Sequence, residues 1–131
     1  MAGELILIVE DNENNRMLVR DVLQSRGYQT AETDNGEEGV RLARASKPAL
    51  ILMDIQLPGM NGMEALKLLR ADASTRDIPV MAVTASAMTH NRQQILAAGF
   101  DAYQTKPINV REFVEGVRVL LTTRPPSPSA S

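Results

Sequence analysis

Three short runs of consecutive apolar residues recur along the chain without alternating polar positions. They are Leu5 to Val9, Leu50 to Met53 and Val80 to Val83. Runs of this kind are typical of parallel strands that are buried on both faces of a sheet. Two weaker strands are expected around Tyr28 to Glu32 and Ala102 to Gln104.

Helical periodicity occupies the segments between these strands, and the strongest pattern is the last one. Its apolar positions follow the i, i+3, i+4, i+7 spacing of a single helix face. These positions are Val110, Phe113, Val114, Val117, Leu120 and Leu121. Asn109 is the expected N-cap, with Glu112 three residues later in the arrangement of a capping box.

The first helix is expected from about Asn14 to Arg26. We expect it to bury Leu18 and Val22 and to end at Gly27, because glycine commonly terminates a helix. Asn12 is the expected cap before it.

Three further helices carry comparable signals. Asn35 and Gly36 open one whose inward residues are Val40 and Ala43, and Asn61 with Glu64 opens one that carries Leu66 and Leu69. The remaining helix covers roughly Met88 to Ala98 and stops at Gly99.

Strand and helix therefore alternate five times, which predicts an α/β domain with a parallel sheet, right-handed crossovers and helices on both faces. We expect the doubly wound, flavodoxin-like strand order 2-1-3-4-5. Residues 1–123 are expected to form this single domain. Residues 124–131 are rich in proline and serine and are expected to be a disordered tail.

Composition narrows the possible functions. The chain has 131 residues, of which 44% are hydrophobic, so one substantial core is expected. The net charge of −2 gives no indication of a nucleic-acid partner, and the absence of cysteine excludes disulfides and thiolate chemistry. The apolar N-terminal run is too short for a signal peptide or a membrane span. We expect a cytoplasmic protein that is a monomer and binds neither nucleic acid nor membrane.

Charged or polar side chains follow four of the five expected strands. Glu10 and Asp11 follow the first, Asp54 the third, Thr84 the fourth and Lys106 the fifth. In a doubly wound sheet, binding sites form beyond the carboxyl ends of the strands. These residues are therefore expected to meet at one edge.

Clustered carboxylates repel one another unless a proton or a cation intervenes. Mg²⁺ is the natural ion here, because it prefers oxygen ligands and accepts one or two carboxylates. An aspartate such as Asp54 can attack phosphorus to form an aspartyl phosphate. Lys106 and the Thr84 hydroxyl would then reach the remaining phosphoryl oxygens.

The same residues carry a resemblance to a known family. The motifs are ILIVEDN at 6–12, LILMDIQLPGMNG at 50–62, VTASA at 83–87 and TKP at 105–107. In order and spacing they resemble CheY-like response-regulator receiver domains, over residues 5 to about 122. The amino-acid sequences of the first two motifs also resemble those of DivK-type single-domain regulators and of the receivers of hybrid histidine kinases.

The resemblance implies a role for each position. Asp54 would be the phosphoacceptor, and Lys106 the lysine that binds the phosphoryl group. Glu10 and Asp11 would be the acidic pair around Mg²⁺, with Asp11 as the direct ligand. Asp54 and the backbone carbonyl of Gln56 would also bind the ion.

The resemblance also implies a switch. Thr84 would move onto the phosphoryl group, Tyr103 would swing inward behind it, and the surface of the fourth helix, fifth strand and fifth helix would repack. An ordinary half-buried tyrosine at a sheet edge remains the alternative for Tyr103. The Lys106–Pro107 bond is usually cis in this family.

The partners implied by the resemblance are a histidine kinase or histidine phosphotransferase and a downstream target protein. Contact with the phosphodonor is expected to use the first helix and the segment after Lys106. The candidate residues are Asn14, Asn15, Leu18, Pro107 and Ile108. His90, the single histidine, is interpreted as an exposed helix residue rather than a phosphodonor.

Two other classes of protein share features of this pattern. A haloacid-dehalogenase-type phosphatase also uses a strand-end aspartate, but it needs an acid two residues later, where this chain has Gln56. A flavodoxin-like cofactor binder needs a phosphate loop after the first strand, where this chain has EDNENN. We expect no catalysis beyond the protein's own phosphorylation and dephosphorylation. A stand-alone regulator is favoured, and a receiver cut from a hybrid histidine kinase or larger regulator is the alternative.

Overall fold

The computed structural model describes residues 3–84 and 92–123 as an alternating α/β fold. Its strands are β1 (Leu5–Val9), β2 (Gln29–Thr33), β3 (Leu50–Asp54), β4 (Val80–Thr84) and β5 (Ala102–Thr105). Its helices are α1 (Glu13–Ser25), α2 (Gly36–Ser46), α3 (Gly62–Ala71), α4 (Arg92–Ala97) and α5 (Val110–Thr123). The five predicted strands are confirmed, with ends that differ by at most one residue.

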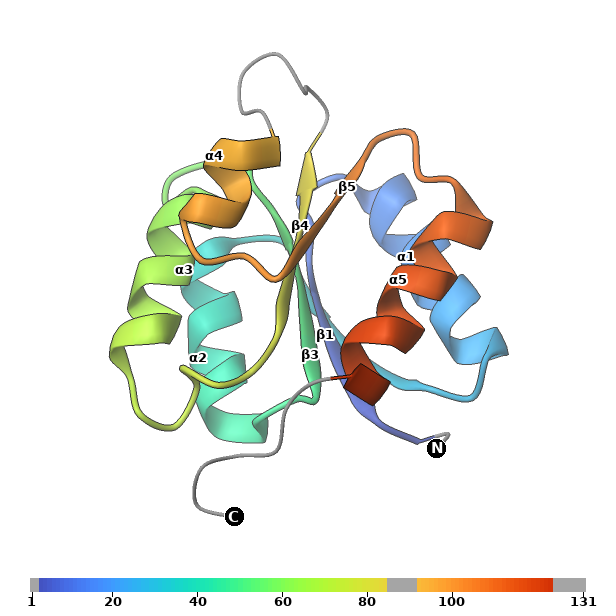
Figure 1. The fold of residues 1–131 in the computed structure, drawn as a ribbon, viewed down its shortest axis with the longest axis horizontal. Helices are drawn as coiled ribbons and strands as arrows, with labels where there is room; N and C mark the ends of the chain where they lie inside the picture. Colours follow the sequence, from blue (N-terminus) through green and yellow to red (C-terminus); the bar gives the residue numbers. More distant parts are fainter. Residues whose placement is uncertain (1–2, 85–91, 124–131) are drawn as a thin grey trace.

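The strands form one parallel sheet in the order β2-β1-β3-β4-β5, as predicted. In Figure 1, α1 and α5 cover one face of this sheet, while α2, α3 and α4 lie on the other side. Among the described residues, no helix has the length and apolar character needed to cross a membrane.

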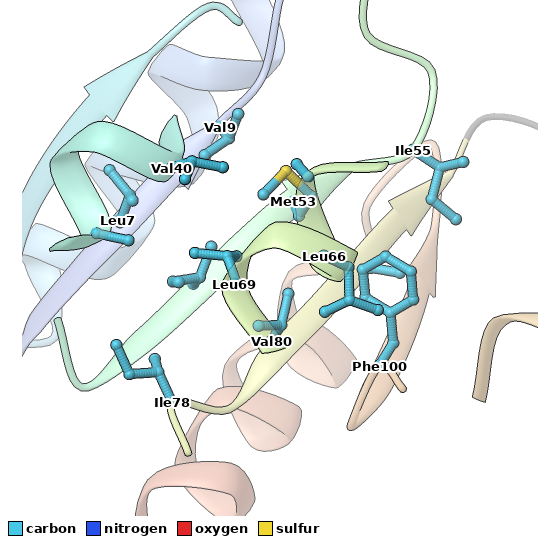
Figure 2. Close-up of a cluster of buried hydrophobic side chains, with 14 of the residues drawn as sticks. Leu7, Val9, Val40, Met53, Ile55, Leu66, Leu69, Ile78, Val80 and Phe100 are labelled. Carbon is cyan, nitrogen blue, oxygen red and sulfur yellow. The ribbon is translucent and has the colours of Figure 1, made fainter. Parts of the chain in front are cut away.

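Two hydrophobic clusters fill the spaces between the sheet and its helices. Figure 2 shows the first, where Val40 of α2 and Leu69 of α3 lie over Leu7, Met53 and Val80 of the sheet. The second lies beneath α1 and α5. Its buried members are Ile6, Ile8, Val19, Leu23, Leu50, Leu52, Met81, Phe113 and Val117. Successive side chains of β1 alternate between the two clusters, which is why its apolar run shows no polar positions.

The orientation of α1 differs from the expectation. Val19 and Leu23 are its buried residues, Val22 is partly buried, and Leu18 is 41% exposed. Residues 18, 19, 22 and 23 are all apolar, so either adjacent i, i+4 pair could mark the buried face. Packing against the sheet and α5 selected the pair one residue later.

The predicted helix caps are present. Asn12, Asn35 and Asn61 each accept a backbone N–H from the third residue of the helix that follows. Asn61 and Glu64 form a complete capping box. Asn109 likewise accepts the N–H of Glu112. The inward residues predicted for α2 and α3 are buried, whereas Val110 at the start of α5 is exposed.

Three expectations concern residues outside the described ranges. They are the start of the fourth helix at Met88, the exposure of His90 and the character of residues 124–131. The described part of that helix, Arg92–Ala97, agrees with the predicted one.

Candidate functional site

Strand register brings the polar strand ends to one edge of the sheet. Val9 pairs with Met53, so Glu10 follows at the level of Asp54. Asp54 pairs with Val83, and Thr84 pairs with Thr105 immediately before Lys106. Because neighbouring strands lie about 5 Å apart, the four strand ends lie side by side at one edge of the sheet, as the sequence predicted.

Asp54 is the last residue of the central strand β3, and only 2% of its surface is exposed. Its Oδ1 accepts the backbone N–H of Gln56 at 2.9 Å. Its Oδ2 lies 3.0 Å from the Lys106 ammonium. The carboxylate is therefore held at both oxygens, which fixes its orientation at the rim.

Lys106 bridges two buried carboxylates. Its Nζ lies 3.0 Å from Asp54 and 3.0 Å from the carboxylate of Glu10. The Lys106 N–H donates to the carbonyl of Thr84 at 2.8 Å, and the Lys106–Pro107 bond is cis, as expected. The ion pair with Glu10 was not predicted, because sequence reasoning assigned this lysine only to the phosphoryl group.

Glu10 and Asp11 differ in exposure. Glu10 is 4% exposed and Asp11 is exposed. Besides Lys106, the Glu10 carboxylate accepts the backbone N–H of Asn12 at 3.1 Å. Carboxylate oxygens of Glu10, Asp11 and Asp54 all lie within 4.8 Å of one another. The carboxylates of the two acids after β1 thus lie close to that of the last residue of β3.

Burial and neighbouring charges shift the pKa values of Glu10 and Lys106. Burial, followed by the neighbouring Asp54 carboxylate, raises the pKa of Glu10 to about 7 in spite of Lys106. For Lys106, burial acts to lower the pKa, but its hydrogen bonds and ion pairs with Asp54 and Glu10 raise it overall. The site therefore holds more negative charge than a single lysine neutralises.

This chemistry fits a hard divalent cation. Three carboxylates within 4.8 Å of one another offer oxygen ligands only. One of the three is exposed, so an ion can enter from solvent. The acidic cluster could therefore bind a metal.

A close approach of the backbone holds the loop after Asp54. A Cβ added at Gly62 would lie 2.4 Å from the Asp54 carbonyl oxygen and 2.8 Å from Ile55 Cα. The Gly62 N–H donates to the carbonyl of Ile55 at 3.0 Å. Only glycine fits here without moving the backbone that carries Asp54.

Thr84 and Tyr103 lie on neighbouring strands. Thr84 is fully buried at the end of β4, and Tyr103 is half-buried on β5, against the cluster beneath α2 and α3. Their predicted roles in a switch remain predictions. Gln56 lies just beyond Asp54 with an exposed side chain.

The residues predicted to contact a phosphodonor belong to α1 and to the segment after β5. Asn14 and Leu18 are exposed on α1, and Asn15 is half-buried there. Pro107 is exposed, while Ile108 packs against the cluster beneath α1 and α5. Their partner role remains a prediction.

Sequence reasoning did not anticipate the contacts of Arg16 beside the acidic cluster. Arg16 of α1 donates from Nη1 to the Glu10 carbonyl at 2.8 Å and from Nε to Glu32 at 3.2 Å. The available signal was a cation close to the start of a helix, where the helix dipole disfavours positive charge.

Comparison with protein families identifies the chain's relatives. The model of the response regulator receiver domain matches residues 6–118. The polar-differentiation response regulator DivK of Brucella anthropi is 48% identical over 116 residues, which cover 88% of this chain and 94% of that protein. DivK of Brucella ovis is 47% identical over the same shares of both chains.

Solved structures are similar in fold. A sensor histidine kinase receiver domain from Pseudomonas aeruginosa PAO1, with a magnesium ion coordinated in its active-site cleft, has a TM-score of 0.85 and 34% identity. The match covers 92% of this chain and 98% of that one. A histidine kinase receiver domain from Syntrophus aciditrophicus has a TM-score of 0.86 and 31% identity, with 97% and 96% coverage.

Proposed function

This chain belongs to the response regulator receiver domain family, and we propose that it accepts a phosphoryl group on Asp54 and signals through a change of shape. The observation that supports this most strongly is the environment of Asp54. Its carboxylate is buried, oriented from both sides, and adjacent to Lys106 and two further acids. Receiver domains interact with histidine kinases and downstream targets, which places this chain in two-component signalling.

These contacts support the following course for the phosphoryl transfer. Asp54 attacks the phosphorus of a phosphohistidine, a P–O bond forms, and the P–N bond breaks with its electron pair leaving on the imidazole nitrogen. Lys106, now 3.0 Å from Asp54, turns its ammonium to the transferred oxygens. The Thr84 hydroxyl supplies a further hydrogen bond. We expect one transfer per molecule rather than turnover.

Glu10, Asp11, Asp54 and the carbonyl of Gln56 are the proposed ligands of Mg²⁺. When bound, the ion offsets negative charge on the transferring group. The magnesium ion in the cleft of the Pseudomonas aeruginosa receiver supports this choice, as does the all-oxygen character of the cluster.

The proposed output is the surface formed by α4, β5 and α5. Thr84 and Tyr103 would link it to Asp54, since they occupy the two strands between the acceptor and the sheet edge. Asn14, Asn15, Leu18, Pro107 and Ile108 are proposed to meet the phosphodonor, a histidine kinase or phosphotransferase. Residues 1–123 would form the receiver.

The test is phosphorylation of the purified protein by acetyl phosphate or a phosphohistidine donor in the presence of Mg²⁺. Intact-mass analysis should show the addition of one phosphoryl group. Asp54→Asn should abolish it, whereas Asp77→Asn, at an exposed position distant in sequence, should not. Equal labelling of Asp54→Asn and wild type would refute the assignment. Continuous release of phosphate from esters would favour a phosphatase instead.

A further inference from the structure

Arg16 occupies a position where a positive charge is unfavourable. It is the fourth residue of α1, close to the positive end of the helix dipole. Its side chain is nevertheless only 19% exposed. An arginine kept out of solvent at this end of a helix requires specific partners to offset both costs.

The partners come from two different segments. Arg16 Nη1 donates to the carbonyl oxygen of Glu10 at 2.8 Å, and Nε donates to Glu32 Oε1 at 3.2 Å. Glu32 belongs to β2, which pairs with β1. The guanidinium therefore fastens the segment after β1 to the neighbouring strand, using the two-sided donor geometry that lysine lacks.

The carbonyl that Arg16 holds belongs to the peptide unit joining Glu10 to Asp11, the two acids that follow β1. On the other side of Glu10, its N–H donates to the Thr33 carbonyl at 3.0 Å. The backbone of Glu10 is thus held on both sides. Because a peptide unit is planar, fixing this oxygen restricts the direction in which Asp11 leaves the strand.

We propose that Arg16 is a positioning residue that holds the Glu10–Asp11 peptide in the orientation needed for both carboxylates to meet Asp54 and a divalent cation. This inference rests on the proposed function. It adds a residue that touches neither the cation nor the phosphoryl group. Outer contacts of this kind commonly change metal affinity by about tenfold or more when they are removed.

Electrostatics and positioning make opposite predictions for the loss of Arg16. Removing a positive charge near an acidic cluster should strengthen the binding of Mg²⁺. Releasing the Glu10–Asp11 peptide should weaken it. A rise in Mg²⁺ affinity on loss of Arg16 would therefore indicate the electrostatic effect, and a fall would indicate positioning.

Arg20 provides a matched control. It lies one turn later on α1 and also faces Glu32, with Nη1 3.6 Å from Oε2. Its described contacts are with Glu32 and Asp21, and they do not include the Glu10 carbonyl. Arg20→Ala therefore removes the same charge from the same helix without releasing the peptide.

The experiment measures Mg²⁺ dissociation constants of the full chain by calorimetry for wild type, Arg16→Ala, Arg16→Lys and Arg20→Ala. We expect Arg16→Ala to bind about tenfold more weakly. Arg16→Lys, which keeps the charge but reaches one partner at a time, should be intermediate. Arg20→Ala should bind as tightly as wild type or more tightly. Arg16→Lys also keeps the test valid if Arg16→Ala folds poorly.

A second readout needs no metal. In EDTA, amide hydrogen exchange at Asn12, whose N–H donates to Glu10 Oε2, should be faster in Arg16→Ala and unchanged in Arg20→Ala. If Arg16→Ala and Arg20→Ala behave alike while wild type binds Mg²⁺ and accepts phosphate, the inference is wrong and the proposed function stands. If wild type does neither, both are wrong.

Discussion

Glu10 has a pKa that folding raises well above the ordinary value of a glutamate. It is an acid at the end of a buried strand, and its pKa rises from an ordinary 4.5 to about 7 because of burial and the nearby Asp54. Between these two pH values the folded protein binds a proton that the unfolded chain releases. The stabilisation from this proton is complete below about pH 4.5 and is lost as the pH rises through about 7.

The raised pKa of Glu10 predicts that the free energy of unfolding depends on pH through this side chain. In EDTA, the free energy of unfolding of wild type should fall from about pH 5 to pH 8 relative to that of Glu10→Gln, which has no proton to lose. Urea unfolding of both proteins across this range measures the difference, and comparison of the pair cancels other titrating groups. Parallel stability curves would contradict the raised pKa.

Lys106 has a second role in the cation-free protein, as the counter-charge of two buried acids. Lys106→Met leaves Asp54 and Glu10 facing each other, with side chains only 2% and 5% exposed. We expect a loss of about 3 kcal/mol in unfolding free energy at pH 8 in EDTA, with partial recovery in Mg²⁺. Urea denaturation checks both effects.

Lys67 of α3 is an exposed lysine and a suitable control for this prediction. Lys67→Met should change the unfolding free energy by less than about 0.5 kcal/mol, because exposed charges contribute little. Equal effects of the two substitutions would contradict the role given to Lys106.

At the scale of elements, the segment from β3 to α3 brings two stretches of backbone so close together that no side chain fits between them. Gly62 stands where any Cβ would lie 2.4 Å from the Asp54 carbonyl oxygen. The asparagine before it completes the capping box of α3. One turn therefore fixes both the start of the helix and the position of the acceptor.

Gly62→Ala should consequently destabilise the protein by about 2 kcal/mol or more and slow labelling of Asp54 by acetyl phosphate. The reason is that Asp54 and Ile55 must shift to admit a methyl group. Urea denaturation and intact-mass kinetics measure the two effects.

Gly116 of α5 is the matched glycine for this comparison. Its added Cβ would meet only the terminal methyl group of Met81, at 3.0 Å, and alanine favours a helix over glycine. Gly116→Ala should therefore stay within about 1 kcal/mol of wild type and label normally. A similar loss in both variants would show that Gly62 has no special constraint.

At the scale of the whole molecule, the sheet separates the proposed acceptor from the proposed output surface by a single strand, β4. Asp54 ends β3, Thr84 ends β4, and Tyr103 lies on β5 beyond it. A phosphoryl group can shift the population of an active state only if it contacts that state better. We propose that the phosphoryl group contacts the active state better because there it accepts a hydrogen bond from the Thr84 hydroxyl.

Thr84→Ala should therefore accept a phosphoryl group to the same extent as wild type but lose the response of α5 and β5. Amide chemical shifts of Ala102, Tyr103 and Gly116, compared before and after phosphorylation, provide the measurement. Thr75→Ala is the control, because Thr75 is an equally buried threonine whose hydroxyl donates to Leu69 at 2.7 Å, before β4 begins. Identical responses of Thr84→Ala and wild type would contradict the switch.

The sequence by itself determined the alternation of strands and helices and the residues of the rim. Apolar runs, capping residues and the polar residue after each strand are local features, and parallel strands bring their carboxyl ends together once the order of elements is known. Asp54, Glu10, Asp11 and Lys106 could be grouped in this way before any distance was known.

The tertiary structure decided which apolar pair of α1 is buried, because Leu18 with Val22 and Val19 with Leu23 satisfy the same periodicity and only the surface of the sheet distinguishes them. It also decided that Lys106 bridges Asp54 to Glu10, a residue 96 positions away, and that Arg16 reaches the Glu10 carbonyl. Contacts of this kind depend on distances between segments, which a local pattern of residues does not contain.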